Sequence, residues 1–184
     1  DAARFADRIG AGADEADEFL GSMLTLASPE RLSLETVDAS ALIAEVVDAL
    51  RETVGERHAI TTDADPIRFP GDRVKLRQAL RNFVANALQV QPDGGRVHVE
   101  ASLADDCVVL RVTDAGPGIP AALRKRVLEP FYTTRADGTG LGLALVSTIA
   151  GLHGGSVEIP PTPSALGGAD VRLRIPHRSP TART

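Results

Sequence analysis

Two asparagines, Asn82 and Asn86, stand one helical turn apart in a segment whose apolar residues recur with a helical period. That spacing places both side chains on one face of a helix, beside the apolar stripe. A carboxamide oxygen is a hard, neutral ligand, which Mg²⁺ accepts when phosphate groups supply most of the negative charge. An isolated pair would more often be two solvated side chains, so its interpretation depends on the motifs that follow.

A second motif, Asp114-Ala115-Gly116-Pro117-Gly118-Ile119, follows an apolar segment with the alternation of a strand. A buried carboxylate at a strand end can accept a hydrogen bond from an amino group such as adenine N6. The glycines around Pro117 build a tight turn that a flat base can approach closely. Guanine would present its O6 acceptor to the carboxylate, so the motif favours adenine. Without the other motifs it would be an ordinary Asp-Gly turn.

A glycine-rich motif, Gly138-Thr139-Gly140-Leu141-Gly142-Leu143, precedes an apolar helical pattern. The start of a helix offers backbone N–H groups and the positive end of the helix dipole, both of which favour phosphate. No Lys follows the last glycine, as a Walker loop requires, and the acidic residue of a dinucleotide fingerprint is absent. A fourth motif, Glu129-Pro130-Phe131-Tyr132-Thr133-Thr134, precedes it. Together the four ordered motifs predict a site for ATP and Mg²⁺.

The surrounding pattern predicts an α/β fold. We expect a two-layer sandwich in which three main helices pack on a mixed sheet, because helices and strands alternate and one pair of strands forms a hairpin. Ser40 and Asp72 are the expected N-caps of the first two helices. Helices are predicted over residues 40–54, 72–90 and 139–152, and strands near 32–37, 58–62, 96–103, 107–113, 156–159 and 170–175.

The N-terminal segment has a different pattern. Apolar or small residues from Phe5 to Leu26 alternate at spacings of four and three, which is the seam of a heptad repeat. This predicts a helix that packs against other helices, with an amphipathic helix lying on its own domain as the alternative. Residues 178–184 are expected to be a disordered tail.

Composition excludes several classes of partner. The net charge of −5 and the pI near 5.4 give no general attraction to nucleic acid or to anionic lipid. The longest apolar stretch is too short to cross a bilayer, so we expect no membrane segment in this chain. The single Cys107 suits a reducing compartment and a cytoplasmic location. With no initiator Met and no signal-peptide pattern, the chain is expected to be an excised piece of a longer protein.

Residues from about 33 to 177 resemble the catalytic ATP-binding domain of bacterial sensor histidine kinases, in the superfamily that also holds gyrase, Hsp90 and MutL. The resemblance implies the Bergerat ATP-binding fold. The Glu-Pro-Phe sequence is typical of the histidine kinases and not of the other branches. The matching segments are the N box at 72–87, the two glycine boxes at 114–119 and 138–143, the F box at 129–135 and the HGG turn at 153–155.

The resemblance also implies roles for individual residues. Asn86 would ligate Mg²⁺ and Asn82 would support the metal and phosphate, while Asp114 would hold adenine N6. Hydrolysing relatives carry a water-activating Glu at the position of Asn82, so Asn there favours phosphoryl transfer over hydrolysis. A lid would span about residues 120–139. The remaining expected ATP contacts are Gly116, Gly118, Ile119, Phe131, Gly138, Thr139, Gly140, Leu141, Gly142 and Leu143.

The chain departs from the family pattern beside the metal-binding position. Many members place a Lys or His near the phosphates where this chain has Gln89, and an aromatic residue where it has Val90. We therefore expect a basic residue of the lid to meet the phosphate charge, and Arg135 is the first candidate. Arg124 and Arg126 are weaker candidates, because a solvated helix face explains them better.

None of the four histidines matches the phosphoacceptor of a sensor kinase, which lies on the first helix of a dimerisation hairpin. Residues 1–32 resemble the second helix of that hairpin with its linker, and residues 33–177 the catalytic domain. We therefore expect a chain that binds ATP without labelling itself and donates the γ-phosphoryl group to a His on an absent helix. Its expected partners are that helix, a second copy in a homodimeric kinase and a response regulator.

Two other functions are open on the sequence. A nucleotide-regulated binding module, pseudokinase-like or anti-sigma-like, would explain the missing acceptor His. A metabolic ATPase is disfavoured by Asn82.

Overall fold

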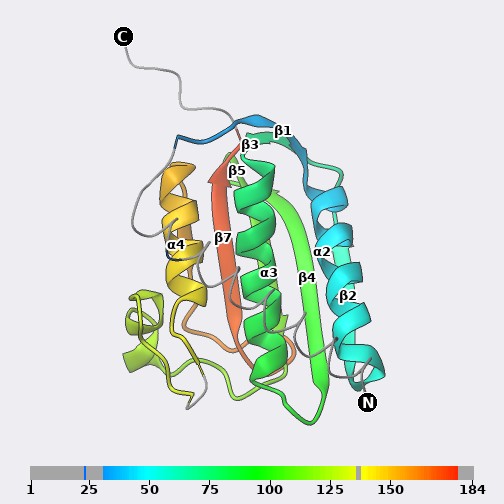
Figure 1. Ribbon diagram of the computed structural model, residues 1–184, viewed down its shortest axis with the longest axis vertical. Coiled ribbons are helices and arrows are strands. Elements are labelled where there is room, and N and C mark those ends of the chain that lie inside the picture. Colours follow the sequence, from blue (N-terminus) through cyan, green and yellow to red (C-terminus); the bar gives the residue numbers. More distant parts are fainter. Residues whose placement is uncertain (1–22, 24–30, 136–137, 178–184) are drawn as a thin grey trace, which may run out of the picture. The chain divides into compact units, whose positions relative to one another are not determined.

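Residue 23 and residues 31–135 and 138–177 are described by a computed structural model, so the heptad segment and the predicted tail lie outside the described residues, apart from residue 23. The described residues from Leu32 onward form one compact unit. Its elements, with η for 3₁₀ helices, are β1 (Glu35–Asp38), α2 (Ala39–Val54), η1 (Gly55–Arg57), β2 (His58–Ala64), β3 (Arg68–Gly71), α3 (Arg73–Gln89), β4 (Gly95–Ala104), β5 (Cys107–Asp114), η2 (Ala121–Leu123), η3 (Arg126–Leu128), α4 (Gly142–Leu152), β6 (Ser156–Glu158) and β7 (Asp170–Pro176) (Figure 1).

A five-stranded sheet carries the fold, in the order β2-β4-β5-β7-β6. Strands β2 and β4 are parallel, and the other neighbours are antiparallel, so the sheet is mixed as predicted. The predicted hairpin joins β4 to β5 through Asp105 and Asp106, whose φ angles are 50° and 57°. Two successive left-handed residues are the geometry of a type I′ turn, which matches the twist of the strands it connects.

The three helices α2, α3 and α4 cover one face of this sheet (Figure 1). Alternate residues of each strand point toward them, because side chains of a strand alternate between its two faces. In β5, Leu110 points to the helices and is fully buried, whereas its neighbour Arg111 points away from them and is half-buried. Each large apolar side chain buried in this way stabilises the fold by about 1.5–3 kcal/mol. The predicted two-layer sandwich is therefore confirmed.

Two of the three helix starts differ from the prediction. Asp72 caps α3 as predicted, its side chain accepting a hydrogen bond from the Lys75 N–H. The cap of α2 is Asp38, not Ser40, whose hydroxyl instead donates to the Asp38 carboxylate at 2.7 Å. Helix α4 begins at Gly142 and not at Thr139.

A polar junction ties the start of α3 to the end of α4. The Asp72 carboxylate accepts from the Ser33 N–H at 3.0 Å, and the Asp72 N–H donates to His153 Nε2 at 3.0 Å. His153 Nδ1 lies 2.8 Å from the Ile149 carbonyl oxygen. Because Nε2 accepts a hydrogen bond, the proton of the neutral ring is on Nδ1 and is donated to that carbonyl.

Burial lowers the pKa of His153 below its ordinary value, although the Ile149 carbonyl and the Asp72 carboxylate act in the opposite direction. The ring is 7% exposed. A second proton would be placed on Nε2, where it would face the Asp72 N–H. The fold therefore requires the neutral imidazole.

In the part of the chain that the structure describes, no helix has the length and apolar character needed to cross a membrane.

The free energy of unfolding should decrease as the pH falls below about 6.5, the ordinary histidine pKa, because the unfolded chain then binds a proton that folded His153 resists. Urea unfolding at several pH values between about 7.5 and 5 measures this slope. His153→Gln should have a shallower slope, since the other three histidines remain in both proteins. Equal slopes in the two proteins would contradict the assignment.

Candidate functional site

The two asparagines of α3 lie against the first residue of α4. A methyl group placed on Gly142 would stand 3.1 Å from Asn82 Oδ1 and 3.1 Å from Asn86 Nδ2, so only glycine leaves both amides undisturbed. Asn82 Nδ2 donates to the Gln78 carbonyl at 3.0 Å. Asn86 Nδ2 is buried and has no hydrogen-bond partner among the described residues. An unsatisfied buried polar group costs about 1–3 kcal/mol, which a ligand here could relieve.

The start of α4 leaves its N–H donors available. Leu141, the N-cap residue, has no polar side-chain atom, whereas aspartates cap α2 and α3. The N–H groups of the first turn have no acceptor within a helix. They lie at the positive end of the helix dipole, which attracts anions. The result is a helix end that can attract an anion, beside two amide side chains.

Asp114 ends β5 and is 4% exposed. Its Oδ1 accepts hydrogen bonds from the Gly116 N–H at 2.8 Å and the Ala169 N–H at 3.1 Å. Burial raises the pKa of this carboxyl, although the two backbone N–H groups act in the opposite direction. Both bonds from the described residues go to Oδ1, so Oδ2 can accept a hydrogen bond from a ligand.

The glycines that follow Asp114 allow the chain to pass close to the end of α3. A methyl group on Gly116 would lie 2.9 Å from Val90 Cγ2, just past the last residue of that helix. Gly118 has a φ of 73° and turns toward the Gly168 backbone. The side chain of Ile119 packs against the hydrophobic core.

The third and fourth motifs contact each other through their backbones. The Phe131 N–H donates to the Gly140 carbonyl at 2.9 Å, and a methyl group on Gly140 would lie 2.4 Å from the Phe131 carbonyl carbon. Phe131 is 65% exposed and has a φ of 66°, a conformation that costs a non-glycine residue roughly 1–2 kcal/mol. Gly138 lies similarly close to Thr133 Oγ1.

Arg135 reaches from the predicted lid back to α3. Its Nη1 donates to Gln89 Oε1, the residue that stands where many family members carry a basic side chain. The two other candidate arginines have different contacts. Arg124 donates to the carbonyl oxygens of Ile119 and Pro161, and Arg126 lies 4.4 Å from the centre of the Tyr132 ring.

All four motifs are thus joined by contacts, although they are distant in the sequence. Asn82 and Asn86 meet the second glycine motif at Gly142, and Val90, the residue after α3, meets the first one at Gly116. Four of the predicted contact residues also have contacts within the protein. Leu141 is buried in the protein, and Leu143, like Ile119, packs against the core. Thr139 Oγ1 accepts weakly, at 3.4 Å, from the Leu141 N–H.

The loop before β7 contributes residues that the sequence did not reveal. Ser164 Oγ donates to the Asp114 carbonyl at 2.9 Å, and the Gly168 N–H donates to the same oxygen at 3.0 Å. The Ala169 carbonyl accepts from the Asp114 N–H at 3.1 Å. A Pro/Gly-rich loop gives no local signal of these bonds, because they depend on β7 lying beside β5.

A metal ion at this site would need ligands from a bound molecule as well as from the protein. Within residues 31–135 and 138–177, no group of three or more His, Cys, Asp or Glu side chains is placed to hold a metal. The amide of Asn86 is a single neutral ligand. It fits a cation that is held mainly by the phosphates of a bound ligand, as Mg²⁺ commonly is.

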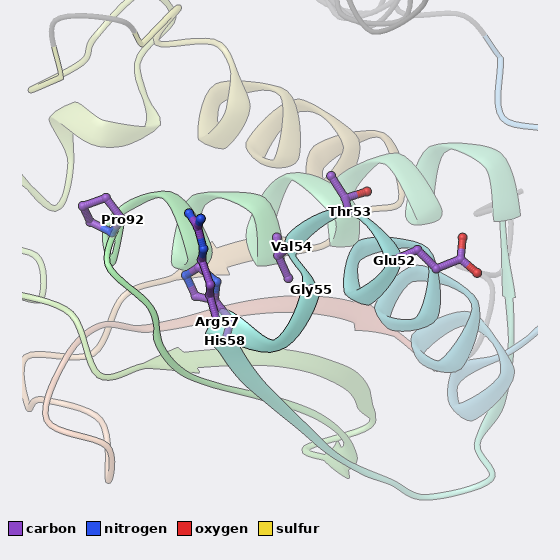
Figure 2. A pocket seen from close by; sticks show the side chains of 7 residues that line it. All are labelled: Glu52, Thr53, Val54, Gly55, Arg57, His58 and Pro92. Atoms are coloured by element: carbon purple, nitrogen blue, oxygen red, sulfur yellow. The ribbon is translucent and has the colours of Figure 1, made fainter. Parts of the chain in front are cut away.

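A separate hollow of about 500 Å³ lies where α2 ends and β2 begins (Figure 2). Its lining includes Arg57, His58 and Pro92, and none of the predicted site residues. His58 Nε2 lies 2.9 Å from the Gln91 carbonyl oxygen, which fixes the ring at the edge of the sheet. The hollow is therefore distinct from the place where the four motifs meet.

Comparison with known proteins gives consistent matches. Residues 71–179 match the family model described as "Histidine kinase-, DNA gyrase B-, and HSP90-like ATPase". The chain is 36% identical to the nitrogen regulation protein NtrY of Azorhizobium caulinodans over 81% of its length, and 33% identical to the sensor histidine kinase ZraS of Escherichia coli over 80%. The solved mycobacterial sensor histidine kinase MprB is 31% identical, with a TM-score of 0.69 over 79% of this chain and 99% of that one.

The match covers only part of the curated relatives. The chain spans 20% of the length of NtrY and 32% of that of ZraS.

Proposed function

The chain belongs to the histidine kinase-, DNA gyrase B- and HSP90-like ATPase family, and we propose that it is the ATP-binding catalytic part of a sensor histidine kinase. In this role it donates the γ-phosphoryl group of ATP to a histidine on a separate dimerisation helix. The observation that carries the proposal is the contact of Asn82 and Asn86 with Gly142, which joins a candidate metal ligand to an anion-binding helix end.

The adenine end of the substrate belongs at Asp114. The buried carboxylate has Oδ2 available to accept a hydrogen bond from the 6-amino group, while backbone N–H groups hold Oδ1. Guanine would present an acceptor to the same oxygen and be rejected, because two acceptors leave a buried group unpaired.

The phosphate end belongs between α3 and the start of α4. Asn86 would hold Mg²⁺ together with phosphate oxygens, and the ion would neutralise charge that develops during transfer. The first-turn N–H groups of α4 would orient the phosphates. Arg135, now bonded to Gln89, lies near enough to α3 to exchange that amide oxygen for a phosphate oxygen.

Transfer is favoured over hydrolysis by the chemistry of Asn82. An amide has no basic site able to take a proton from water, so it cannot act as the general base of an ATPase. The nucleophile must then be supplied by another group. The cited relatives ZraS and MprB are sensor histidine kinases, which favours a histidine acceptor over a regulatory module.

Three of the four described histidines already make hydrogen bonds through their rings, and are poorly suited to be that acceptor. His153 is buried with both ring nitrogens in hydrogen bonds, and His98 on β4 is bonded to Thr61 Oγ1 at 2.9 Å. His58 is bonded to the Gln91 carbonyl. We assign the acceptor to the first helix of a dimerisation hairpin, residues 1–32 to its second helix and linker, and residues 33–177 to the catalytic domain. In a homodimeric kinase in the cytoplasm, a response regulator would then receive the phosphoryl group.

With γ-³²P-labelled ATP and Mg²⁺, the chain alone should acquire no stable label. A dimerisation helix carrying its acceptor histidine, supplied in trans, should acquire acid-labile label. Gel autoradiography after acid and base treatment distinguishes acid-labile label from stable label. Stable label on the chain itself would contradict the proposed division of roles.

Asp114→Asn should weaken ATP binding roughly 10- to 100-fold, because an amide can place a donor against the 6-amino group and the charge is lost. The same change should raise the stability of the nucleotide-free protein. Burial raises the pKa of Asp114, so its stability contribution is lost as the pH rises through that pKa, and a neutral amide removes the cost. Calorimetric titration and thermal melts measure both effects. Asp93→Asn, at an exposed position, is the control and should change neither.

Asn86→Ala and Arg135→Ala should each weaken ATP binding about tenfold or more while leaving AMP binding nearly unchanged, since both residues are assigned to the terminal phosphates. Asn86→Ala should also reduce the Mg²⁺ dependence of ATP affinity. Arg126→Ala removes the same charge from the same lid and serves as the control. Wild-type ATP affinity in a folded Arg135→Ala protein would exclude Arg135 from phosphate binding.

A further inference from the structure

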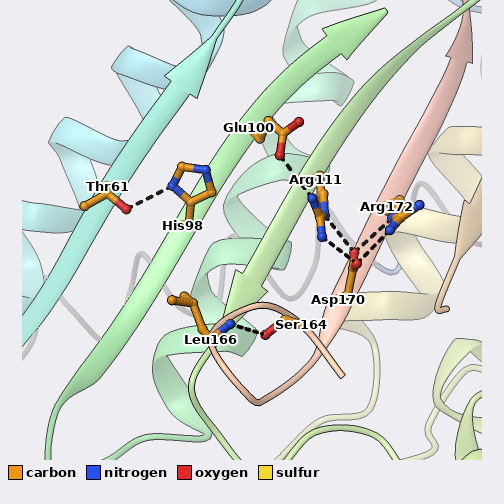
Figure 3. A network of polar contacts seen from close by, with 8 residues as sticks. All are labelled: Thr61, His98, Glu100, Arg111, Ser164, Leu166, Asp170 and Arg172. Carbon is orange, nitrogen blue, oxygen red and sulfur yellow. Dashed lines mark hydrogen bonds and ion pairs between the residues drawn. The ribbon is translucent and has the colours of Figure 1, made fainter. Parts of the chain in front are cut away.

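A charged cluster lies on the face of the sheet that points away from the helices (Figure 3). Asp170, the first residue of β7, is at its centre and is 4% exposed. Arg111 on β5 donates to it through Nε at 3.1 Å and Nη2 at 2.8 Å. Arg172 donates through the same pair of nitrogens at 3.0 and 2.8 Å. One carboxylate thus receives two bidentate guanidinium groups.

Bidentate pairs fix geometry as well as charge, because the planar fork of arginine matches the two oxygens of a carboxylate. Four such bonds hold the Asp170 side chain, and with it the backbone where β7 begins. Arg111 also pairs with Glu100 through its remaining nitrogen Nη1, at 3.2 Å. The cluster of two arginines and two carboxylates is therefore electrically balanced.

The residue before Asp170 faces the opposite side of the sheet. Ala169 exchanges two hydrogen bonds with Asp114, because its N–H donates to Oδ1 at 3.1 Å and its carbonyl accepts from the Asp114 N–H at 3.1 Å. The backbone of Gly168 also packs closely against the same carboxylate, since a methyl group there would clash with Asp114 Oδ1. A small shift at the start of β7 would therefore displace the Asp114 carboxylate.

We propose that Asp170, clamped by Arg111 and Arg172 on one face of the sheet, is a positioning residue that sets the Asp114 carboxylate for adenine on the other face. This inference rests on the proposed function, in which Asp114 accepts from the 6-amino group. Asp170 touches no substrate, and acts through the backbone of Ala169. The expected consequence is a selective one, confined to the recognition of the amino group.

The test compares ATP with purine riboside triphosphate, which lacks the 6-amino group, on wild type and Asp170→Asn. ATP affinity should fall about tenfold, while affinity for the analogue should change less than about twofold. Glu100→Gln is the control, because Glu100 contacts Arg111 without touching Asp170, and it should bind both ligands like the wild type. In the Asp114→Asn background, Asp170→Asn should cause no further loss of ATP affinity.

Equal losses for the two ligands would show a general structural role and overturn the inference, as would no loss for either. Circular dichroism and thermal melts establish that the variants are folded. If Asp170→Asn does not fold, Arg172→Lys keeps the charge, removes one of the two bidentate pairs and must show the same selectivity. A wild-type chain that fails to bind ATP would overturn the proposed function, whereas ATP binding with an unselective Asp170→Asn would overturn this inference alone.

Discussion

A buried carboxylate costs several kcal/mol unless hydrogen bonds replace the water that it loses, and two backbone N–H groups offset part of this cost for Asp114 at the end of β5. Its donors are the backbone N–H groups of Gly116 and Ala169. The second donor exists only because β7 runs beside β5 and because the loop before β7 returns over the strand end, where Ser164 secures it. The strand order of the sheet therefore decides whether the Asp114 carboxylate has its second hydrogen-bond donor. A site built from the first glycine motif without β7 would leave the charge with a single donor.

The candidate site also depends on the packing of helix α3. One of its faces carries Leu76, Leu80 and Val84 into the core, and the adjacent face presents Asn82 and Asn86 to the start of α4. The apolar face fixes the helix on the sheet, and so fixes the amides at the same time. The packing energy that holds the core thus also holds an unsatisfied buried amide group, which a purely structural helix would avoid. This local conflict between stability and polar satisfaction is typical of a functional position.

The sequence predicted most of the helices and strands, because apolar residues recur with clearly different periods in the two. It also predicted the cap at Asp72, because an acidic residue stands directly before the helical pattern. The same reasoning failed at Ser40, where Asp38 competes for the cap and binds the serine hydroxyl. It also failed at Thr139, because Gly140 has a φ of 67° that no α-helix contains. The bonds of Asp114 to the loop before β7 were missed for another reason. They join segments whose proximity depends on strand order, which local periodicity does not encode.

The junction of Ser33, Asp72 and His153 has a mechanical consequence. The chain reaches the domain at Ser33, whose N–H is held by the Asp72 carboxylate, and the Asp72 N–H is held in turn by His153 at the end of α4. A force on the entering chain would therefore act on the start of one helix and the end of another, as well as on β1, into which the chain continues. Since these two helices carry Asn86 and Gly142, such a force would act on both sides of the candidate phosphate site.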